Sequence, residues 1–92
     1  MPLTRQEIGA YDSDRGIVEF TMSEGSRIVR CAISTAAMDD LEASSGTKSN
    51  KRVEQFTRLR DRVEARASQK FDEGSLEARE PRVVLRSHDF DR

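Results

Sequence analysis

The fold is decided by residues 17–33, which read IVEFTMSEGSRIVRCAI. In each half of this stretch apolar side chains recur at every second position, as at Val18, Phe20 and Met22. The matching positions of the second half are Val29, Cys31 and Ile33. Period two with β-branched and aromatic residues is typical of a half-buried strand, and the short connection around Gly25 suits a turn. The stretch therefore predicts a β-hairpin over residues 17–33 with one face toward a core.

Residues 1–15 form a polar N-terminal segment that runs into the sequence Asp-Ser-Asp-Arg-Gly at residues 12–16. Asp, Ser and Gly at this density favour a turn. A calcium loop is the alternative, but Gly16 comes one place early for an EF-hand and Ser23 stands where the closing Glu belongs. We interpret the segment as a turn, and whether residues 1–11 add a strand stays open.

A short helix is predicted over residues 35–43, directly after the hairpin. Ser34 is typical of its N-cap, since its hydroxyl can accept from a free amide of the first turn. The acidic residues Asp39, Asp40 and Glu42 are expected on the side that faces water.

A long amphipathic helix is predicted over residues 50–71, capped by Ser49 or Asn50 and ended near Gly74 in a left-handed conformation. Its larger apolar residues fall in an arc of about 120° on a helical wheel. They are Val53, Phe56, Leu59, Val63, Ala67 and Phe71. Such an arc covers a core or a partner.

A third strand is predicted over residues 82–87, where the arginines and the preceding Pro81 suit an edge position. The residues after it, 88–92, are expected to fray. The chain as a whole is predicted to be one small α+β domain, residues 1–92, in the order β-β-α-α-β. Its small antiparallel sheet, the hairpin plus the C-terminal strand, is packed by the two helices.

These patterns resemble a known family. The sequence Gly-Ile-Val-Glu-Phe at residues 16–20, the strand 29–34, the long helix with Phe56 and Arg60, and the closing residues 83–90 are similar to short bacterial proteins catalogued as domain of unknown function 1488. The resemblance covers nearly the whole chain. It implies a small bacterial α+β domain, and it implies no activity, ligand or catalytic residue.

Charge is unevenly distributed along the chain. The whole chain holds 16 Lys and Arg against 17 Asp and Glu, a net charge of −1. Residues 50–71 carry +4 and the remainder carries −5. Lys51, Arg58, Arg62 and Arg66 fall on one side of the long helix, opposite the apolar arc, and we call them the basic ridge. Such a ridge suits a solvated face that docks partly on acidic groups of the same chain, a protein partner, or a phosphate backbone.

Arg60 is the exception to the separation of charge on the helix, because it falls inside the apolar arc. An unpaired guanidinium there would be costly to bury. Either its stem packs while its head reaches a carboxylate or water, or it belongs to a subunit interface, where arginine is favoured.

Little in the sequence points to catalysis. Cys31 lies within a predicted buried strand and His88 near the other end, so neither a nucleophile–base pair nor a metal site is expected. We expect no cofactor, no membrane span and, from the single cysteine and the polar start, a cytoplasmic setting. We therefore expect a non-enzymatic interaction module, with self-association as one form of it; the alternative is a nucleic-acid-associated accessory protein that uses the basic ridge.

Overall fold

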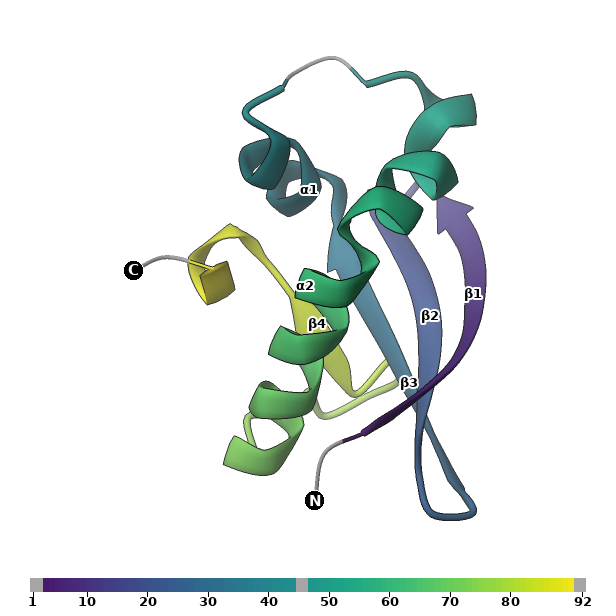
Figure 1. Cartoon of the computed structure of the whole chain (residues 1–92), viewed down its shortest axis with the longest axis vertical. Helices are drawn as coiled ribbons and strands as arrows, with labels where there is room; N and C mark the ends of the chain where they lie inside the picture. Colours follow the sequence, from purple (N-terminus) through teal and green to yellow (C-terminus); the bar gives the residue numbers. More distant parts are fainter. Residues whose placement is uncertain (1–2, 45–46, 91–92) are drawn as a thin grey trace.

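The computed structural model describes residues 3–44 and 47–90, which form a four-stranded sheet in the order β1-β2-β3-β4 with both α-helices on one face (Figure 1). The elements are β1 Thr4–Asp12, β2 Ile17–Glu24, β3 Arg27–Ser34, α1 Thr35–Glu42, the 3-10 turn η1 Ser49–Lys51, α2 Arg52–Glu73, β4 Val83–Leu85 and the 3-10 turn η2 Ser87–Phe90. The predicted α+β class is confirmed.

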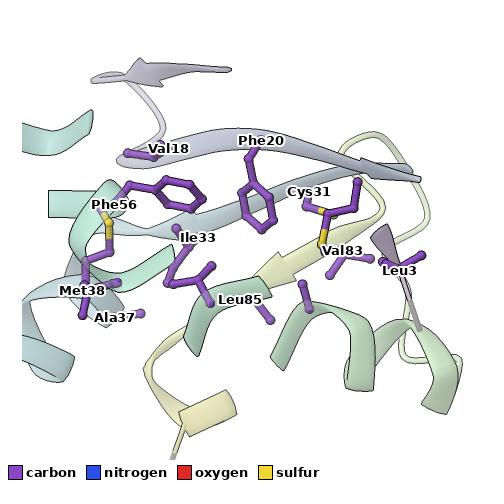
Figure 2. Packing of buried hydrophobic residues seen from close by; sticks show 14 of the residues in the cluster. Leu3, Val18, Phe20, Cys31, Ile33, Ala37, Met38, Phe56, Val83 and Leu85 are labelled. Atoms are coloured by element: carbon purple, nitrogen blue, oxygen red, sulfur yellow. The ribbon is translucent and has the colours of Figure 1, made fainter. Parts of the chain in front are cut away.

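The hairpin forms as predicted. Strands β2 and β3 pair antiparallel without a break, with Phe20 opposite Cys31 and Met22 opposite Val29. The alternating positions are buried beneath the helices and form the centre of the core (Figure 2). Phe20 meets Phe56 of α2 with ring centroids 4.9 Å apart and the ring planes tilted by 40°. The turn at residues 12–16 also forms, with the Asp12 carboxylate accepting from the amides of Asp14 and Arg15.

Strand β1 answers the question left open by the sequence, because residues 4–12 add an antiparallel edge strand to the hairpin. Its register shifts twice, between Arg5 and Ile8 and between Ile8 and Tyr11. At Gly9, a Cβ atom would lie 2.8 Å from the carbonyl oxygen of Glu19 on β2, so the two backbones approach too closely for a side chain.

The sheet is mixed, and the prediction of a purely antiparallel sheet is wrong at its last strand. β4 lies at the edge, as expected, but it pairs parallel to β3, with Ala32 opposite Val84. The reason is the path of the helices. At 1.5 Å per residue the 22 residues of α2 span about 33 Å, so the chain returns along the sheet and β4 starts from the same end as β3.

Helix α1 begins as predicted, with the Ser34 hydroxyl accepting from the Ala37 amide at 3.1 Å. The expectation that its acidic residues face water is wrong for two of the three. Asp40 is exposed, whereas Asp39 and Glu42 turn toward α2 and pair with its side chains. The physical reason is charge, because Arg52 and Arg58 of α2 pair with Asp39 and Glu42.

Helix α2 ends at Gly74 in the left-handed conformation, as predicted, with φ of 77°. Its start differs from the prediction, since neither Ser49 nor Asn50 caps it. Both residues lie in the 3-10 turn η1, and no side chain caps the helix at Lys51. Val53, at the rim of the predicted apolar arc, remains 40% exposed.

The C-terminal residues 87–90 are ordered rather than frayed, as far as the structure describes them. They form η2, in which the Asp89 carboxylate accepts from the Arg86 amide at 2.8 Å. Phe90 packs partly against the core. Asp91 and Arg92 lie outside the described residues.

Candidate functional site

The basic ridge on α2 is largely engaged with the acidic groups of the same chain. Arg58 donates to both carboxylate oxygens of Glu42, at 2.9 and 3.0 Å. This contact lowers the pKa of Glu42 and raises that of Arg58. The Nε of Arg66 donates to the Asp89 carbonyl oxygen at 2.6 Å.

Two residues of the basic ridge form weaker contacts with acidic groups, or none. Lys51 lies 3.4 Å from Glu54, one turn along the helix, and both side chains are exposed. Arg62 is exposed, and its guanidinium contacts no carboxylate among residues 3–44 and 47–90. The structure therefore brings Arg58 and Arg66 onto acidic partners and leaves Arg62 free on the surface.

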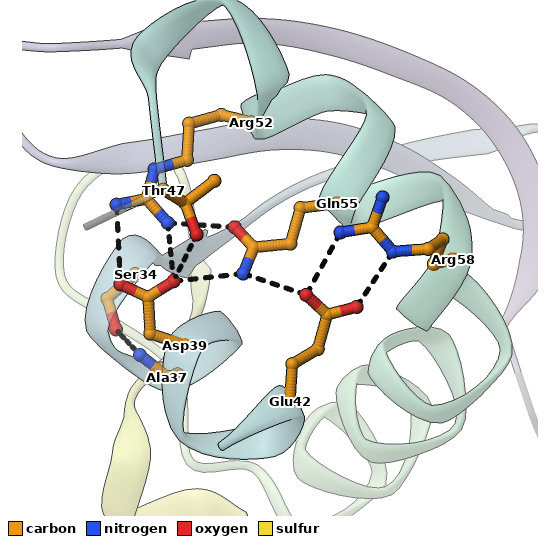
Figure 3. A network of polar contacts seen from close by, with 8 residues as sticks. All are labelled: Ser34, Ala37, Asp39, Glu42, Thr47, Arg52, Gln55 and Arg58. Carbon is orange, nitrogen blue, oxygen red and sulfur yellow. Dashed lines mark hydrogen bonds and ion pairs between the residues drawn. The ribbon is translucent and has the colours of Figure 1, made fainter. Parts of the chain in front are cut away.

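A partly buried polar network joins α1 to α2 (Figure 3). The Asp39 carboxylate accepts from Arg52 at 2.8 Å, from Gln55 at 2.9 Å and from the Thr47 hydroxyl at 3.0 Å. The Gln55 amide also donates to Glu42 at 3.2 Å. The Arg52 hydrogen bond is the main reason why the pKa of Asp39 is lowered. The network ties α1 to α2, and it accounts for an arginine and a glutamine in buried positions of α2.

Arg60 engages the edge strand β1. Its Nε donates to Glu64 at 2.9 Å, and its terminal nitrogen donates to the Gln6 carbonyl oxygen at 3.1 Å. Glu64 also accepts from Arg5 on β1 at 2.6 Å. The stem of Arg60 therefore packs on the core while its head reaches a carboxylate, which is the first of the two interpretations given above. A role at a subunit interface stays a prediction.

Lys70 is a second basic residue that the sequence placed on α2 and that the structure buries. Its Nζ donates to the Val84 carbonyl oxygen at 2.7 Å and to Asp89 at 3.1 Å. Burial alone would raise the pKa of Asp89, but the Arg86 amide and the Lys70 ammonium together lower it. This contact ties β4 and η2 to the last turns of α2.

A shallow groove of about 160 Å³ lies at the turn end of the hairpin, next to the C-terminal end of α2. We call it the hairpin groove, and it is lined by Arg27, Ile28, Val29, Arg30, Phe71, Leu76, Glu80 and Arg82. Ile28 is 56% exposed, more than any other large hydrophobic residue among those that the structure describes. Three arginines against one glutamate make the rim basic.

The arginines of the hairpin groove keep much of their hydrogen-bonding capacity. The Arg27 side chain contacts no acidic group in the part of the chain that the structure describes. Arg30 lies 3.9 Å from Glu19, and Arg82 donates one bond to the Glu77 carbonyl oxygen. The groove thus combines exposed apolar surface with cationic donors, a combination that suits a partner carrying both apolar and acidic side chains.

Comparison with known families matches residues 6–80 to the DUF1488 family, described as a protein of unknown function. The chain belongs to the DUF1488 family. The crystal structure of a DUF1488 protein of unknown function from Shewanella loihica PV-4 is similar, with a TM-score of 0.73 and 16% sequence identity. The alignment covers 89% of this chain and 94% of that chain. At this identity the likeness shows the shared fold. No curated protein matches the chain.

The residues that the sequence raised for catalysis lie on different elements of this DUF1488 fold. Cys31 is buried in β3, and burial is the main reason why the pKa of its thiol is raised to about 12. His88 is mostly exposed on η2. Among the described residues there is no group of three or more His, Cys, Asp or Glu that could hold a metal ion.

Neither helix of this DUF1488 chain, as far as it is described, is long and apolar enough to cross a membrane.

The hairpin groove was missed by sequence reasoning. Its signal in the sequence was Ile28, a large apolar residue on the outer face of its strand.

Proposed function

We propose that the chain is a non-enzymatic interaction module that binds an acidic, partly apolar segment of another protein in the hairpin groove. The observation that carries the proposal is Ile28, which is 56% exposed between arginines of the groove. An exposed isoleucine costs little in a single position, but this one lines the same groove as Phe71 and Leu76, so a partner seated there can cover all three.

Charge complementarity selects the class of partner. The groove arginines would attract acidic side chains and raise the rate of encounter, while Ile28 and Phe71 would hold an apolar side chain. A non-enzymatic role also suits Cys31, because a buried thiol with a pKa of about 12 stays protonated at neutral pH. A buried free thiol further suits the cytoplasmic setting that we propose for the module.

The alternative is a nucleic-acid-associated role of the basic ridge, and fewer unpaired basic side chains support it. Arg58 and Arg66 already donate to Glu42 and Asp89, so a phosphate would have to displace those partners. Arg62 and Lys51 remain, and two cations release few counterions. We therefore favour the hairpin groove.

Three baits distinguish the two surfaces. The wild-type chain, an Arg27→Glu/Ile28→Asp variant and an Arg62→Glu/Val53→Asp variant are immobilised and used to capture proteins from a bacterial extract at low salt. The second variant is a matched control, since it changes the free arginine of the ridge and the exposed valine of α2 in the same way.

We expect a protein that the wild type and the control capture, that the groove variant loses, and that salt elutes. Capture that the ridge variant loses instead, with absorbance at 260 nm in the eluate, would favour the nucleic-acid alternative. The absorbance is informative because the chain has no Trp and one Tyr. Equal capture by all three baits would sink the proposal.

A further inference from the structure

A second recess lies on the face of the sheet that points away from the helices. Ile17, Ala32 and Val84 form a small buried cluster there, separate from the main core. They alternate along their strands with Val18, Ile33 and Leu85 of the core, so they project from the opposite face. The side chains that border this cluster decide what the face can bind.

A pocket of about 640 Å³ opens beside Ile17. Three segments distant in the sequence supply its nitrogen-bearing side chains: Arg15 from the turn after β1, Arg86 directly after β4 and the imidazole of His88 from η2. Ser34 and Ser87 add hydroxyl groups. We call it the open-face pocket. Its volume falls within the range usual for small-molecule sites, about 300–1,000 Å³.

The charge of the open-face pocket is not balanced by its lining. No Asp or Glu is among the described residues that line it. The Arg15 guanidinium contacts no acidic side chain in the described ranges. The Arg86 guanidinium forms an ion pair with Glu77 at 3.6 Å, which is longer than a hydrogen bond and leaves its N–H donors available.

We propose that the open-face pocket binds the phosphate group of a small phosphorylated molecule. Two guanidinium groups present planar forks of donors, and a phosphate offers three terminal oxygens to them, whereas a carboxylate offers two. The hydroxyls of Ser34 and Ser87 can bond an oxygen that the guanidiniums leave free. Ile17 supplies an apolar wall for the rest of the molecule.

Helix α1 adds a smaller contribution. Ala36, in its first turn, also lines the pocket, and the first turn of a helix favours an anion. The proposal rests on the guanidinium groups, because they carry full charges on two elements that are fixed independently. Arg86 is held through its own amide, which donates to Asp89 at 2.8 Å.

The proposal is tested by titrating the isotope-labelled chain with inorganic phosphate and, separately, with adenosine monophosphate, while amide and side-chain NMR signals are followed at physiological salt. We expect saturable shifts at Arg15, Arg86 and His88. If the pocket also contacts the organic part of its ligand, adenosine monophosphate will bind more tightly than inorganic phosphate. If the pocket recognises free phosphate, the two probes will bind equally well.

An Arg15→Ala/Arg86→Ala variant should weaken binding of the tighter probe by about tenfold or more, as expected for lost charged hydrogen bonds. The control is Arg79→Ala, because Arg79 lines the neighbouring recess and not this pocket. Both variants change exposed side chains, and circular dichroism verifies that they fold. Three results would overturn the proposal: no saturable shift with either probe, binding that survives the double variant, or an equal loss in Arg79→Ala.

Discussion

Arg52 and Arg62 lie ten residues apart on α2, yet one is 8% exposed within a polar network and the other is free on the surface. The difference lies in what reaches them from elsewhere. Asp39 of α1 meets the guanidinium of Arg52, and no acidic group among the described residues meets that of Arg62. A helical wheel shows only the angle of a side chain on its own helix. It could place both arginines but could not assign their partners.

Asp39 offers a prediction at the residue scale. Replacing Asp39 with Asn keeps the shape and removes the charge that Arg52 and Gln55 face. We expect the free energy of unfolding to fall by about 1–3 kcal/mol near neutral pH. Because the pKa of Asp39 is lowered by folding, its contribution is present above the ordinary value of 3.8 and is lost as the pH falls below it. Urea denaturation near neutral pH and at about pH 3 measures both effects.

The matched control is Asp40→Asn, on the exposed neighbour, which should change stability by less than about 0.5 kcal/mol. A loss in Asp39→Asn that stays constant down to low pH would show that the carboxylate charge is not what stabilises the network.

A variant at Arg60 distinguishes a role within the folded chain from a role at a subunit interface. Arg60→Ala removes bonds to Glu64 and to the Gln6 carbonyl, so we expect a loss of stability of about 1–2 kcal/mol. Arg62→Ala, two residues along, should change stability little. Light scattering should give the wild type, Arg60→Ala and Arg62→Ala the same molar mass. A lower mass for Arg60→Ala with unchanged stability would place Arg60 in a subunit interface instead.

At the scale of elements, the hairpin could be predicted from sequence and β1 could not. Residues 17–33 keep an apolar residue at every second position, from Val18 to Met22 and from Val29 to Ile33, because that face of each strand is buried in the main core. Residues 4–12 are mostly exposed, with two register shifts, so no period survives. β1 is held by its pairing with β2 and by contacts with α2, where Ser68 accepts from the amide of Leu3, just before β1, and Glu64 accepts from Arg5. Contacts of this kind, about 60 residues apart, leave no local pattern.

The close approach at Gly9 gives the prediction for this element. Gly9→Ala forces a Cβ atom against the Glu19 carbonyl oxygen, so β1 must move away from β2. We expect a loss of about 1–3 kcal/mol and faster hydrogen exchange at the amides shared by the two strands. Exchange measured by mass spectrometry on peptides of β1 and β2 checks the location.

Gly25→Ala is the control for that variant. Gly25 has a φ of 61° and open space around it, so alanine there costs backbone strain of about 1 kcal/mol without a clash. Its exchange pattern in β1 should match the wild type. If Gly9→Ala also leaves β1 exchange unchanged, the two strands do not approach as closely as described.

At the scale of the whole molecule, the opposite charges of its parts are brought together by folding. Residues 50–71 carry +4 and the remainder −5, and the structure sets Arg52, Arg58 and Lys70 against Asp39, Glu42 and Asp89. The near-zero net charge therefore reflects in part the ion pairs that the long helix forms with acidic residues of the same chain. Arg27 at the hairpin groove, Arg15 at the open-face pocket and Arg62 on α2 contact no acidic side chain among the described residues. The sequence did not predict the groove or the pocket, because each is assembled from separate segments.

The most direct test of the hairpin groove is site-specific photo-cross-linking in living cells. A photoreactive amino acid is placed at position 28 in one variant and at position 53 in another, which hold the exposed large hydrophobic residues of the described part of the chain. They belong to elements at opposite ends of the molecule, the hairpin turn and the start of α2 (Figure 1). We predict a protein adduct from position 28 that Arg27→Glu weakens, and no such adduct from position 53. An adduct from position 53 alone, or from neither position, would contradict the proposed function.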